Sequence, residues 1–359
     1  MNLGFVVHRY DLGEGTGGYV VRLAEELCRD HDITIYAREF GSTPPAGTRA
    51  IEVPAFGGPS ISTILSFPRS FEKVRLSHDV LHAQGWVAFE ADVVTTHIVY
   101  GAWRATAKKH KHASSIGEML FGSLIESQER KLLTRHAKQI IAPSQFAKYD
   151  IERLYGITEN INVIPHGFAV PADLETTRTV LPAGVTRGDQ VLALYAGDAR
   201  KGLDPILNIL AGVQNVHLLV ASHSNPTRYL SAAERNMISD RVTWLGPQPN
   251  VGAWVSSVDL LVHPTIYDTF ALVVAEAMAA GVPVVTSDKA GVSELIEHRQ
   301  SGWIIPAGDE GALTEALNTL ASDNALRERI GNSGREVARG RTWEHVAKQT
   351  LSVYERAVS

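Results

Sequence analysis

Two groups of charged residues in the second half of the chain have the types and spacing that would bind a diphosphate ester. Arg200 and Lys201 follow an apolar run in YAGDARKG, where two neighbouring cations can neutralise a diphosphate. Asp268 precedes the apolar stretch 270–280, which is typical of a helix, and Glu276 follows about two turns later. A carboxylate two turns inside a helix can accept hydrogen bonds from the paired hydroxyls of a ribose, and one at the mouth can hold the hydroxyls of a sugar.

The start of this expected helix adds a second kind of anion site. Backbone amides in the first turn of a helix have no partner within the helix, and the helix dipole makes this end positive. The helix is expected to begin near Phe270, so its first amides would face a bound anion. The predicted donor-binding residues at this edge of the sheet are Gly197, which ends the strand before Arg200, and the residues at the start of the helix, Thr269, Phe270, Ala271 and Leu272.

A glycine-rich stretch near the N-terminus, DLGEGTGGYVV, contains the G-x-G-x-x-G pattern of dinucleotide-binding loops. With Glu39 as a ribose-binding acid, an NAD(P)-dependent oxidoreductase is one interpretation. Two features argue against it: the loop between the apolar run and the first glycine is long, and Glu14 would repel a diphosphate. We favour a loop that lines an interdomain cleft, with Gly17 and Gly18 allowing close approach to the donor and a helix from Tyr19 pointing its positive end there.

The elements that would position these residues alternate along the chain. Short β-branched runs are followed by longer amphipathic segments, which predicts parallel sheets covered by helices on both faces. The segment 162–189, rich in proline and glycine, interrupts this alternation, which then restarts. We therefore predict an α/β protein with two doubly wound, Rossmann-like domains, residues 1–168 and 169–342, that face each other across a cleft.

Composition excludes several classes of protein. The chain has 359 residues, of which 44% are apolar and 20% charged, and its net charge of -5 does not fit a general nucleic-acid binder. Cys28 is the only cysteine, so an intramolecular disulfide and a zinc site of several thiolates are excluded. The sequence has no metal-binding histidine spacing, no signal peptide and no apolar run of about 18 residues, so we expect a cytoplasmic protein with no metal or cofactor.

Together these segments resemble the retaining glycosyltransferases of family 4, which have the GT-B fold. The family's pattern of an acid, seven residues and a glutamate is matched by DTFALVVAEAMAAGVPVV, its Arg/Lys pair by ARKG and its linker entry by VIPHG. TWEHVAKQTLSVYERA resembles the family's final helix, so residues 343–359 are expected to return to the first domain. The similarity covers nearly the whole chain, and the glycine loop with the short RKG turn is similar to that of lipopolysaccharide-core glucosyltransferases.

The resemblance implies a role for each domain and for the charged residues. The first domain would bind the acceptor and the second the nucleotide sugar. Arg200 and Lys201 would bind the diphosphate and stabilise the leaving nucleotide, while Glu276 would bind the ribose. Asp268 would contact the transferred sugar, and His97, after the run DVVTT, would face an outer hydroxyl of that sugar. The implied catalytic set is therefore His97, Arg200, Lys201 and Asp268.

Two positions depart from the family's pattern. Asp268 stands where the family usually has glutamate, which is one methylene longer, and Gln84 stands where many members have the second histidine of an HxH motif. Of the other histidines, His8 and His263 are interpreted as packing or loop residues. The acceptor site is expected to be lined by Tyr19, Trp103 and Arg104.

The implied reaction is the transfer of a sugar from a nucleotide diphosphate sugar, with UDP as the expected nucleotide, to a hydroxyl of a glycan, a glycolipid or a small molecule. It would proceed with retention and without a metal ion. Two alternatives stay open: a GT-B enzyme of different chemistry, such as an epimerase or phosphorylase, and a non-catalytic sugar-nucleotide binder. The basic run KKHKH, 108–112, is either a solvated face or a contact with an anionic membrane surface, which would make the protein peripheral.

Overall fold

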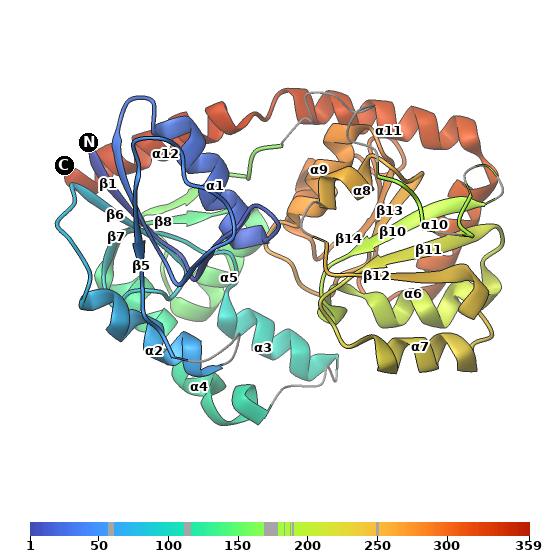
Figure 1. Cartoon of the computed structure of the whole chain (residues 1–359), viewed down its shortest axis with the longest axis horizontal. Helices are drawn as coiled ribbons and strands as arrows, with labels where there is room; N and C mark the ends of the chain where they lie inside the picture. Colours follow the sequence, from blue (N-terminus) through green and yellow to red (C-terminus); the bar gives the residue numbers. More distant parts are fainter. Residues whose placement is uncertain are drawn as a thin grey trace. The chain divides into compact units, whose positions relative to one another are not determined.

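The chain forms two compact units, Met1–Gly167 together with Trp343–Ser359, and Phe168–Thr342. The computed structural model (Figure 1) describes residues 1–56, 61–110, 116–168, 179–182, 184–186, 188, 190–248 and 251–359. Because the last residues belong to the first unit, the chain passes from one unit to the other twice. The boundaries expected from the sequence are 168/169 and 342/343.

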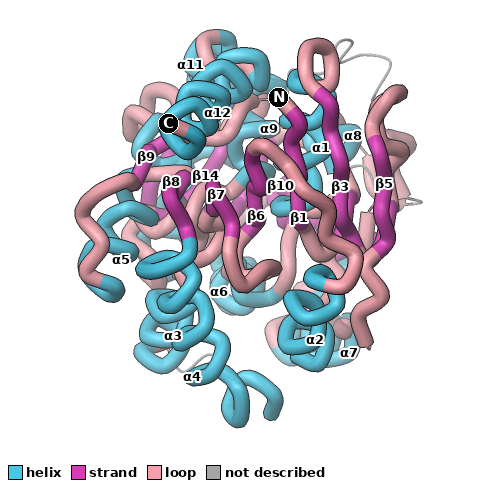
Figure 2. The backbone as a smooth tube through the Cα atoms, turned by 90° about the vertical axis from the view of Figure 1, so that its left-hand side faces the viewer, coloured by secondary structure: helices cyan, strands magenta, loops and turns pink. Residues whose placement is uncertain are grey.

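The N-terminal unit is built on a seven-stranded parallel sheet, whose strands lie side by side in Figure 2. Almost every residue of its central strands is buried, as expected where both faces of a parallel sheet are covered. A separate two-stranded pair, β2 (Arg9–Tyr10) and β4 (Glu39–Phe40), lies beside the glycine loop. In spatial order the sheet contains β5 (Arg49–Glu52), β3 (Asp32–Ala37), β1 (Asn2–Val6), β6 (Val80–Gln84), β7 (Ala91–Thr95), β8 (Ala137–Ala142) and β9 (Ile161–Val163).

Helices cover this sheet and are ended by local signals. The best example is α5, which Ser144 caps by accepting a hydrogen bond from the amide of Ala147, and which Gly156 ends at a φ of 70°. The final helix, α12, packs against α1 and against β6, β7 and β8, so the end of the chain completes the core of the first unit. The α-helices are α1 (Gly15–Leu27), α2 (Ile61–Glu72), α3 (Tyr100–Lys109), α4 (Ile116–Lys131), α5 (Gln145–Tyr155) and α12 (Trp343–Val358).

The C-terminal unit has a six-stranded parallel sheet whose first strand, β10, lies in the middle. In spatial order the strands are β12 (Val242–Gly246), β11 (Val216–Ala221), β10 (Val191–Ala196), β13 (Leu260–His263), β14 (Val284–Ser287) and β15 (Trp303–Ile305). This is the strand order of the dinucleotide-binding Rossmann sheet. Its α-helices are α6 (Leu203–Ile209), α7 (Pro226–Arg235), α8 (Val251–Val255), α9 (Leu272–Ala280), α10 (Glu310–Ser322) and α11 (Asn324–Arg339).

The core of the C-terminal unit lies on both faces of this sheet. Along β10, Leu192 and Leu194 belong to one buried cluster, whereas Ala193 and Tyr195 belong to the other. Successive side chains of a strand point to opposite faces, so β10 has no face left for polar chemistry. Polar chemistry is therefore confined to the ends of the strands.

The two doubly wound, Rossmann-like domains predicted from the sequence are confirmed, but two helix starts were wrong. α1 begins at Gly15 rather than Tyr19, and α9 begins at Leu272 rather than Phe270. Gly17 and Gly18, expected in a loop, lie in α1 and pack against residues 9–12. Phe270 and Ala271, expected in a helix, lie in the loop before α9, where their amides bond to Asp268. Among the described residues, no helix combines the length and apolar character needed to cross a membrane.

Candidate active site

The predicted donor-binding residues gather where the strand order of the C-terminal sheet reverses. β11 follows β10 on one side of it, whereas β13 lies on the other side. In open parallel sheets, ligands bind outside the carboxyl ends of the strands at such a point. Lys201 lies on the turn that leaves β10, and Asp268 lies on the loop that leaves β13. The structure therefore brings together two residues that are 67 positions apart in the chain.

Asp268 has donors on both of its carboxylate oxygens. Lys201 forms an ion pair with Oδ2, and Nε2 of His263 lies 3.3 Å from the same oxygen. Oδ1 accepts hydrogen bonds from the backbone amides of Phe270 at 3.2 Å and Ala271 at 3.0 Å. Lys201 and Asp268 are only 18% and 12% exposed, so water screens this pair weakly.

Burial and charge act in opposite directions on this carboxylate. Burial raises the pKa of Asp268, but the Lys201 charge and the hydrogen bond from His263 outweigh it and hold the pKa well below its usual range. Burial also lowers the pKa of His263, so its ring is neutral and donates from Nε2 to Asp268. His263, interpreted from the sequence as a packing residue, is buried and also contacts the predicted site.

The loop before α9 is tighter than the sequence suggests. Ala271 has φ 73° and ψ 73°, a left-handed conformation that costs a non-glycine residue about 1–2 kcal/mol. This turn directs the amides of Phe270 and Ala271 onto Asp268, so both are already satisfied by an anion of the protein itself. Thr269 is buried beside them, and Glu276 is half-buried one turn into α9.

The turn after β10 depends on two glycines. Gly197 and Gly202 have φ values of 143° and 103°, which other residues rarely adopt. A Cβ on Gly202 would lie 2.4 Å from the carbonyl oxygen of Pro264, so this glycine lets the β10 turn touch the β13 loop. Arg200, in the same turn, points its guanidinium at Asp198, with Nε 2.9 Å from Oδ2.

In the N-terminal unit, the glycine loop packs against its own backbone. A Cβ on Gly17 would lie 2.6 Å from the carbonyl oxygen of Arg9, and one on Gly18 would lie 3.0 Å from that of Leu12. Close packing against residues 9–12 is therefore one reason for glycine at these positions, and the expected approach of the donor stays a prediction. Arg9 also lies 3.0 Å from Glu14, which neutralises the carboxylate expected to repel a diphosphate.

His97 lies in a cluster of buried aromatic and polar side chains. Its Nε2 is 2.8 Å from Oε1 of Gln84, the last residue of β6. The ring of Tyr19 meets the His97 ring edge-on, with centroids 5.0 Å apart, and the His166 ring lies 5.4 Å away. Tyr19 has no exposed surface, so a direct contact with an acceptor would require its side chain to move.

The other two residues expected at the acceptor site, Trp103 and Arg104, both lie on α3. Trp103 is buried in α3, with 5% of its surface exposed. Arg104 forms an ion pair with Glu126 and donates to the hydroxyl of Ser123 at 3.1 Å, both on α4. The contacts of Arg104 attach α3 to α4, yet 35% of its side chain stays exposed. The acceptor role expected of Trp103 and Arg104 stays a prediction.

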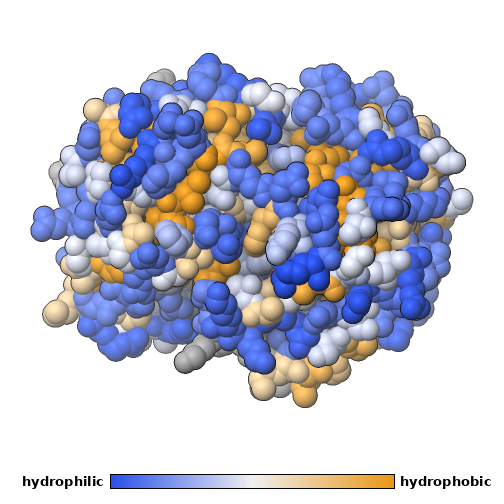
Figure 3. Space-filling view, turned by 180° about the vertical axis from the view of Figure 1, so that it is seen from behind, coloured by the Kyte–Doolittle hydropathy of each residue, from blue (hydrophilic) through white to orange (hydrophobic). Residues whose placement is uncertain are grey.

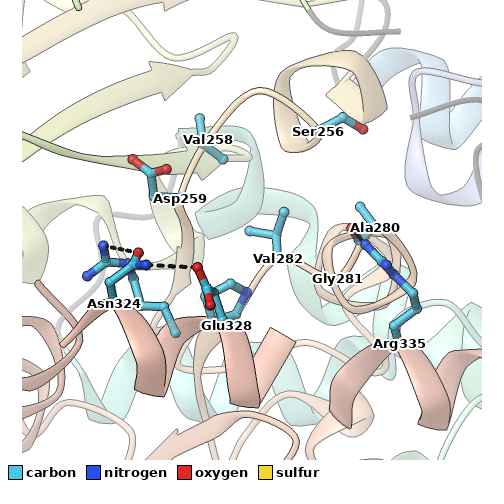
Figure 4. A pocket seen from close by; sticks show the side chains of 11 residues that line it. Ser256, Val258, Asp259, Ala280, Gly281, Val282, Asn324, Glu328 and Arg335 are labelled. Carbon is cyan, nitrogen blue, oxygen red and sulfur yellow. Dashed lines mark hydrogen bonds between the residues drawn. The ribbon is translucent and has the colours of Figure 1, made fainter. Parts of the chain in front are cut away.

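A cavity of about 320 Å³ in the C-terminal unit lies at the opposite end of the strands (Figure 4). It opens where β13 and β14 begin, and none of the predicted site residues lines it. Its arginines bond to backbone carbonyls near helix ends: Arg335 donates to the carbonyl of Ala280 at 2.7 Å, and Arg327 donates to that of Ala321 at 3.3 Å. The lining residues are Ser256, Val258, Asp259, Ala280, Gly281, Val282, Pro283, Asn324, Arg327, Glu328 and Arg335.

Comparison with known families assigns both units. Residues 13–170 match the model of Glycosyltransferase Family 4, and residues 184–337 match that of Glycosyl transferases group 1. The chain belongs to glycosyltransferase family 4. This confirms the resemblance read from the sequence motifs, and it rules out the oxidoreductase suggested by the glycine pattern. The enzyme is thus a transferase of sugars.

Individual relatives agree with this assignment. The glycosyltransferase is 28% identical to a phosphatidyl-myo-inositol mannosyltransferase of Mycobacterium leprae, over 99% of this chain and 96% of the relative. It is 26% identical to a D-inositol 3-phosphate glycosyltransferase of Xylanimonas cellulosilytica, over 96% and 92% of the two chains.

Two solved structures share the fold. WaaG, a glycosyltransferase involved in lipopolysaccharide biosynthesis, superposes with a TM-score of 0.79 at 19% identity, over 98% of this chain and 99% of WaaG. Sucrose-phosphate synthase from Thermosynechococcus elongatus superposes with a TM-score of 0.80 at 22% identity, over 99% and 98% of the two chains. The predicted GT-B fold is therefore confirmed.

Proposed function

We propose that this glycosyltransferase moves a sugar from a UDP-sugar to a hydroxyl acceptor, with retention of configuration and without a metal ion. The observation that carries the proposal is the buried Lys201–Asp268 pair at the strand-order reversal of the C-terminal sheet. A buried ammonium at that position suits a phosphate, and the carboxylate beside it suits a sugar hydroxyl.

The donor would bind by an exchange of partners. Lys201 holds Asp268, and Arg200 holds Asp198, in the ligand-free protein. A diphosphate brings the negative charge that both cations need, so each would turn from its carboxylate to a phosphate oxygen. Glu276, half-buried on α9, would accept hydrogen bonds from the ribose hydroxyls.

The main barrier is the charge that develops on the departing nucleotide as the bond between sugar and phosphate breaks. Fixed cations at that place stabilise the charge without reorganising. Because Lys201 and Arg200 supply positive charge themselves, we expect transfer to survive an excess of EDTA. Retention predicts that the anomeric configuration of the product, read from proton couplings by NMR, equals that of the donor.

The acceptor class is supported by the names of the relatives, which concern inositol phosphates and their lipids. An acceptor in a membrane requires a surface that binds it, and α4 offers one. Its outer face exposes apolar side chains, and Figure 3 shows hydrophobic atoms at the lower edge, where α4 lies in Figure 1. The exposed residues are Met119 (75%), Leu120 (70%), Phe121 (40%) and Leu124 (45%).

Basic residues next to this face would add attraction to anionic lipid. Lys108 and Lys109 end α3, and Arg130 and Lys131 end α4. Each such charge contributes roughly 1 kcal/mol near an anionic bilayer. Of the run 108–112, Lys111 and His112 lie outside the described residues. A peripheral position on the cytoplasmic face of a membrane is therefore part of the proposal.

The membrane contact can be tested by sedimentation with phosphatidylglycerol vesicles. Leu120→Glu should release the protein from the vesicles, because it places a charge in the apolar face. Met237→Glu is the matched control, since Met237 is 88% exposed in the C-terminal unit. Equal binding of both variants and the wild type would remove α4 from the proposal.

The donor can be tested by thermal stabilisation with UDP-, GDP- and ADP-sugars, followed by product analysis. We expect stabilisation by UDP-sugars, slow hydrolysis of the donor without an acceptor, and loss of both in Glu276→Ala. Glu336→Ala, at an exposed position of α11, should retain both. Binding without turnover would favour a sugar-nucleotide binder, and an isomerised nucleotide sugar would favour an epimerase. Stabilisation by none of these donors would overturn the proposal.

A further inference from the structure

We propose that Gln84 is a positioning residue that fixes which nitrogen of His97 carries the proton and how the His97 ring is oriented. The effect on transfer rests on the proposed function together with the role that the family resemblance implies for His97, which is to face a hydroxyl of the sugar. The protonation of the ring is a property of the ligand-free protein and can be tested by itself.

The contact comes from two neighbouring strands. Gln84 ends β6 and pairs with Thr95 at the end of β7, and His97 follows two residues later. Gln84 is 5% exposed, and its Oε1 lies 2.8 Å from Nε2 of His97. An amide oxygen can only accept a hydrogen bond, so Nε2 carries the proton and Nδ1 does not.

The rest of the surroundings hold the plane of the ring. Tyr19 of α1 meets the His97 ring edge-on, with an interplanar angle of 70°, and His166 packs against it at 40°. His166 in turn stacks on Trp343 at 20°, and Trp343 also contacts Tyr19. Aromatic contacts define where the ring lies but do not distinguish its two nitrogens, whereas the hydrogen bond to Gln84 is made by Nε2 and does distinguish them.

A glutamine in this position also keeps His97 neutral. Burial lowers the pKa of His97, and the side chain of Gln84 has no charge to offset this. The titratable groups that face His97 are Tyr19 from α1, His82 from β6 and His166 from the segment after β9. Burial raises the pKa of Tyr19 to about 12 and lowers that of His82 to about 3, so both are uncharged at neutral pH.

The bond to His97 is made by the side-chain oxygen of Gln84. Its amide nitrogen is buried and has no hydrogen-bond partner within the described part of the chain. An unsatisfied buried donor is unfavourable, so the amide nitrogen does not help to hold the Gln84 side chain in place. The hydrogen bond of the Gln84 side chain goes to His97, which is what a positioning residue requires.

The first test is the nitrogen NMR spectrum of the His97 ring in the ligand-free wild type. We expect the form protonated at Nε2 to dominate. In Gln84→Leu, loss of one hydrogen bond of about 1 kcal/mol should change the ratio of the two forms by roughly fivefold. Gln139→Leu is the matched control, because Gln139 is 8% exposed on β8 and bonds to Asn162 instead. A wild-type ring protonated at Nδ1, or an unchanged ratio in Gln84→Leu, would overturn the proposal.

The second test uses charge. Gln84→Glu places a carboxylate beside Nε2, which should raise the pKa of His97 and make kcat/KM for sugar transfer depend on pH near neutrality, where the wild type is flat. Gln139→Glu should leave the profile flat. A flat profile in Gln84→Glu, with the NMR shift present, would preserve the positioning role and refute the role at the sugar that the family resemblance implies for His97. No transfer in the wild type would refute the proposed function alone, since the NMR result stands independently.

Discussion

The buried Lys201–Asp268 pair allows a quantitative prediction about the C-terminal unit. Two unit charges about 4 Å apart, at an effective dielectric constant of about 20, attract each other by about 4 kcal/mol. Both side chains are less than one-fifth exposed, so this attraction is not lost to solvent. Removing one partner of such a pair leaves the other charge buried and uncompensated, which typically costs about 3–5 kcal/mol.

The two single variants should differ in cost. Asp268→Asn leaves the Lys201 ammonium without its carboxylate, and we expect a loss of about 4 kcal/mol in the free energy of unfolding. Lys201→Met should cost only about 2 kcal/mol, because Asp268 keeps His263 and two backbone amides as donors. The double variant leaves no unpaired charge and should lose about 3 kcal/mol, well short of the additive value.

The assay is denaturant unfolding at pH 7, followed by hydrogen exchange in the peptides of β10 and β13. The pKa of Asp268 is lowered in the folded unit, so its stabilisation is fully present above its ordinary pKa of 3.8 and is lost only in stronger acid. The exposed pair Arg299–Glu315, 52% and 61% exposed, is the control and should couple by less than about 1 kcal/mol. Additive losses for Lys201 and Asp268 would refute the reasoning.

Three further variants test local features. Gly17→Ala should destabilise the N-terminal unit by about 1–3 kcal/mol, since the new Cβ would meet a backbone oxygen at 2.6 Å. The Cβ of Gly15→Ala would meet nothing within 4 Å, so this variant should gain about 0.5–1 kcal/mol of helix stability. Equal Tm values for the two variants would contradict this. Gly202→Ala should reduce both Tm and donor affinity, whereas Gly212→Ala should change neither. Unchanged donor affinity in Gly202→Ala would refute the inference that the contact between the β10 turn and the β13 loop shapes the donor site. Burial raises the pKa of Glu129 to about 7, so its contribution is favourable below pH 4.5 and is lost as pH rises through 7. Glu129→Gln should therefore be more stable than the wild type by about 3 kcal/mol at pH 8 and equal to it at pH 4.5; the same difference at both pH values would disprove this assignment.

The sequence predicted the architecture because alternating apolar runs and amphipathic segments are local patterns. It also predicted that Lys201 and Asp268 lie at one sheet edge, since parallel strands end on the same side. Both predictions follow from the order of helices and strands, which can be read directly from the sequence. The ends of strands were therefore the most informative positions in this sequence.

What the sequence did not predict depends on contacts between segments. The left-handed turn at Ala271 is not expected of alanine, and it directs the amide of Ala271 onto Asp268. His263 was interpreted as packing because no local pattern marks its contact with Asp268. The close packing of Gly17 against the backbone of Arg9 was also not predicted. A signal for this was present, because Arg9 is spaced to form ion pairs with both Asp11 and Glu14.

The return of α12 to the first unit has a consequence for synthesis. His82 bonds to Tyr354 at 2.7 Å, across 272 positions of sequence. A ribosome moving at about 5–20 residues per second needs roughly ten to thirty seconds to make the C-terminal unit before α12 emerges. During that interval residues 1–167 lack the helix that covers β6, β7 and β8. The unit translated second can therefore finish folding first, while the unit translated first waits with apolar surface available to chaperones.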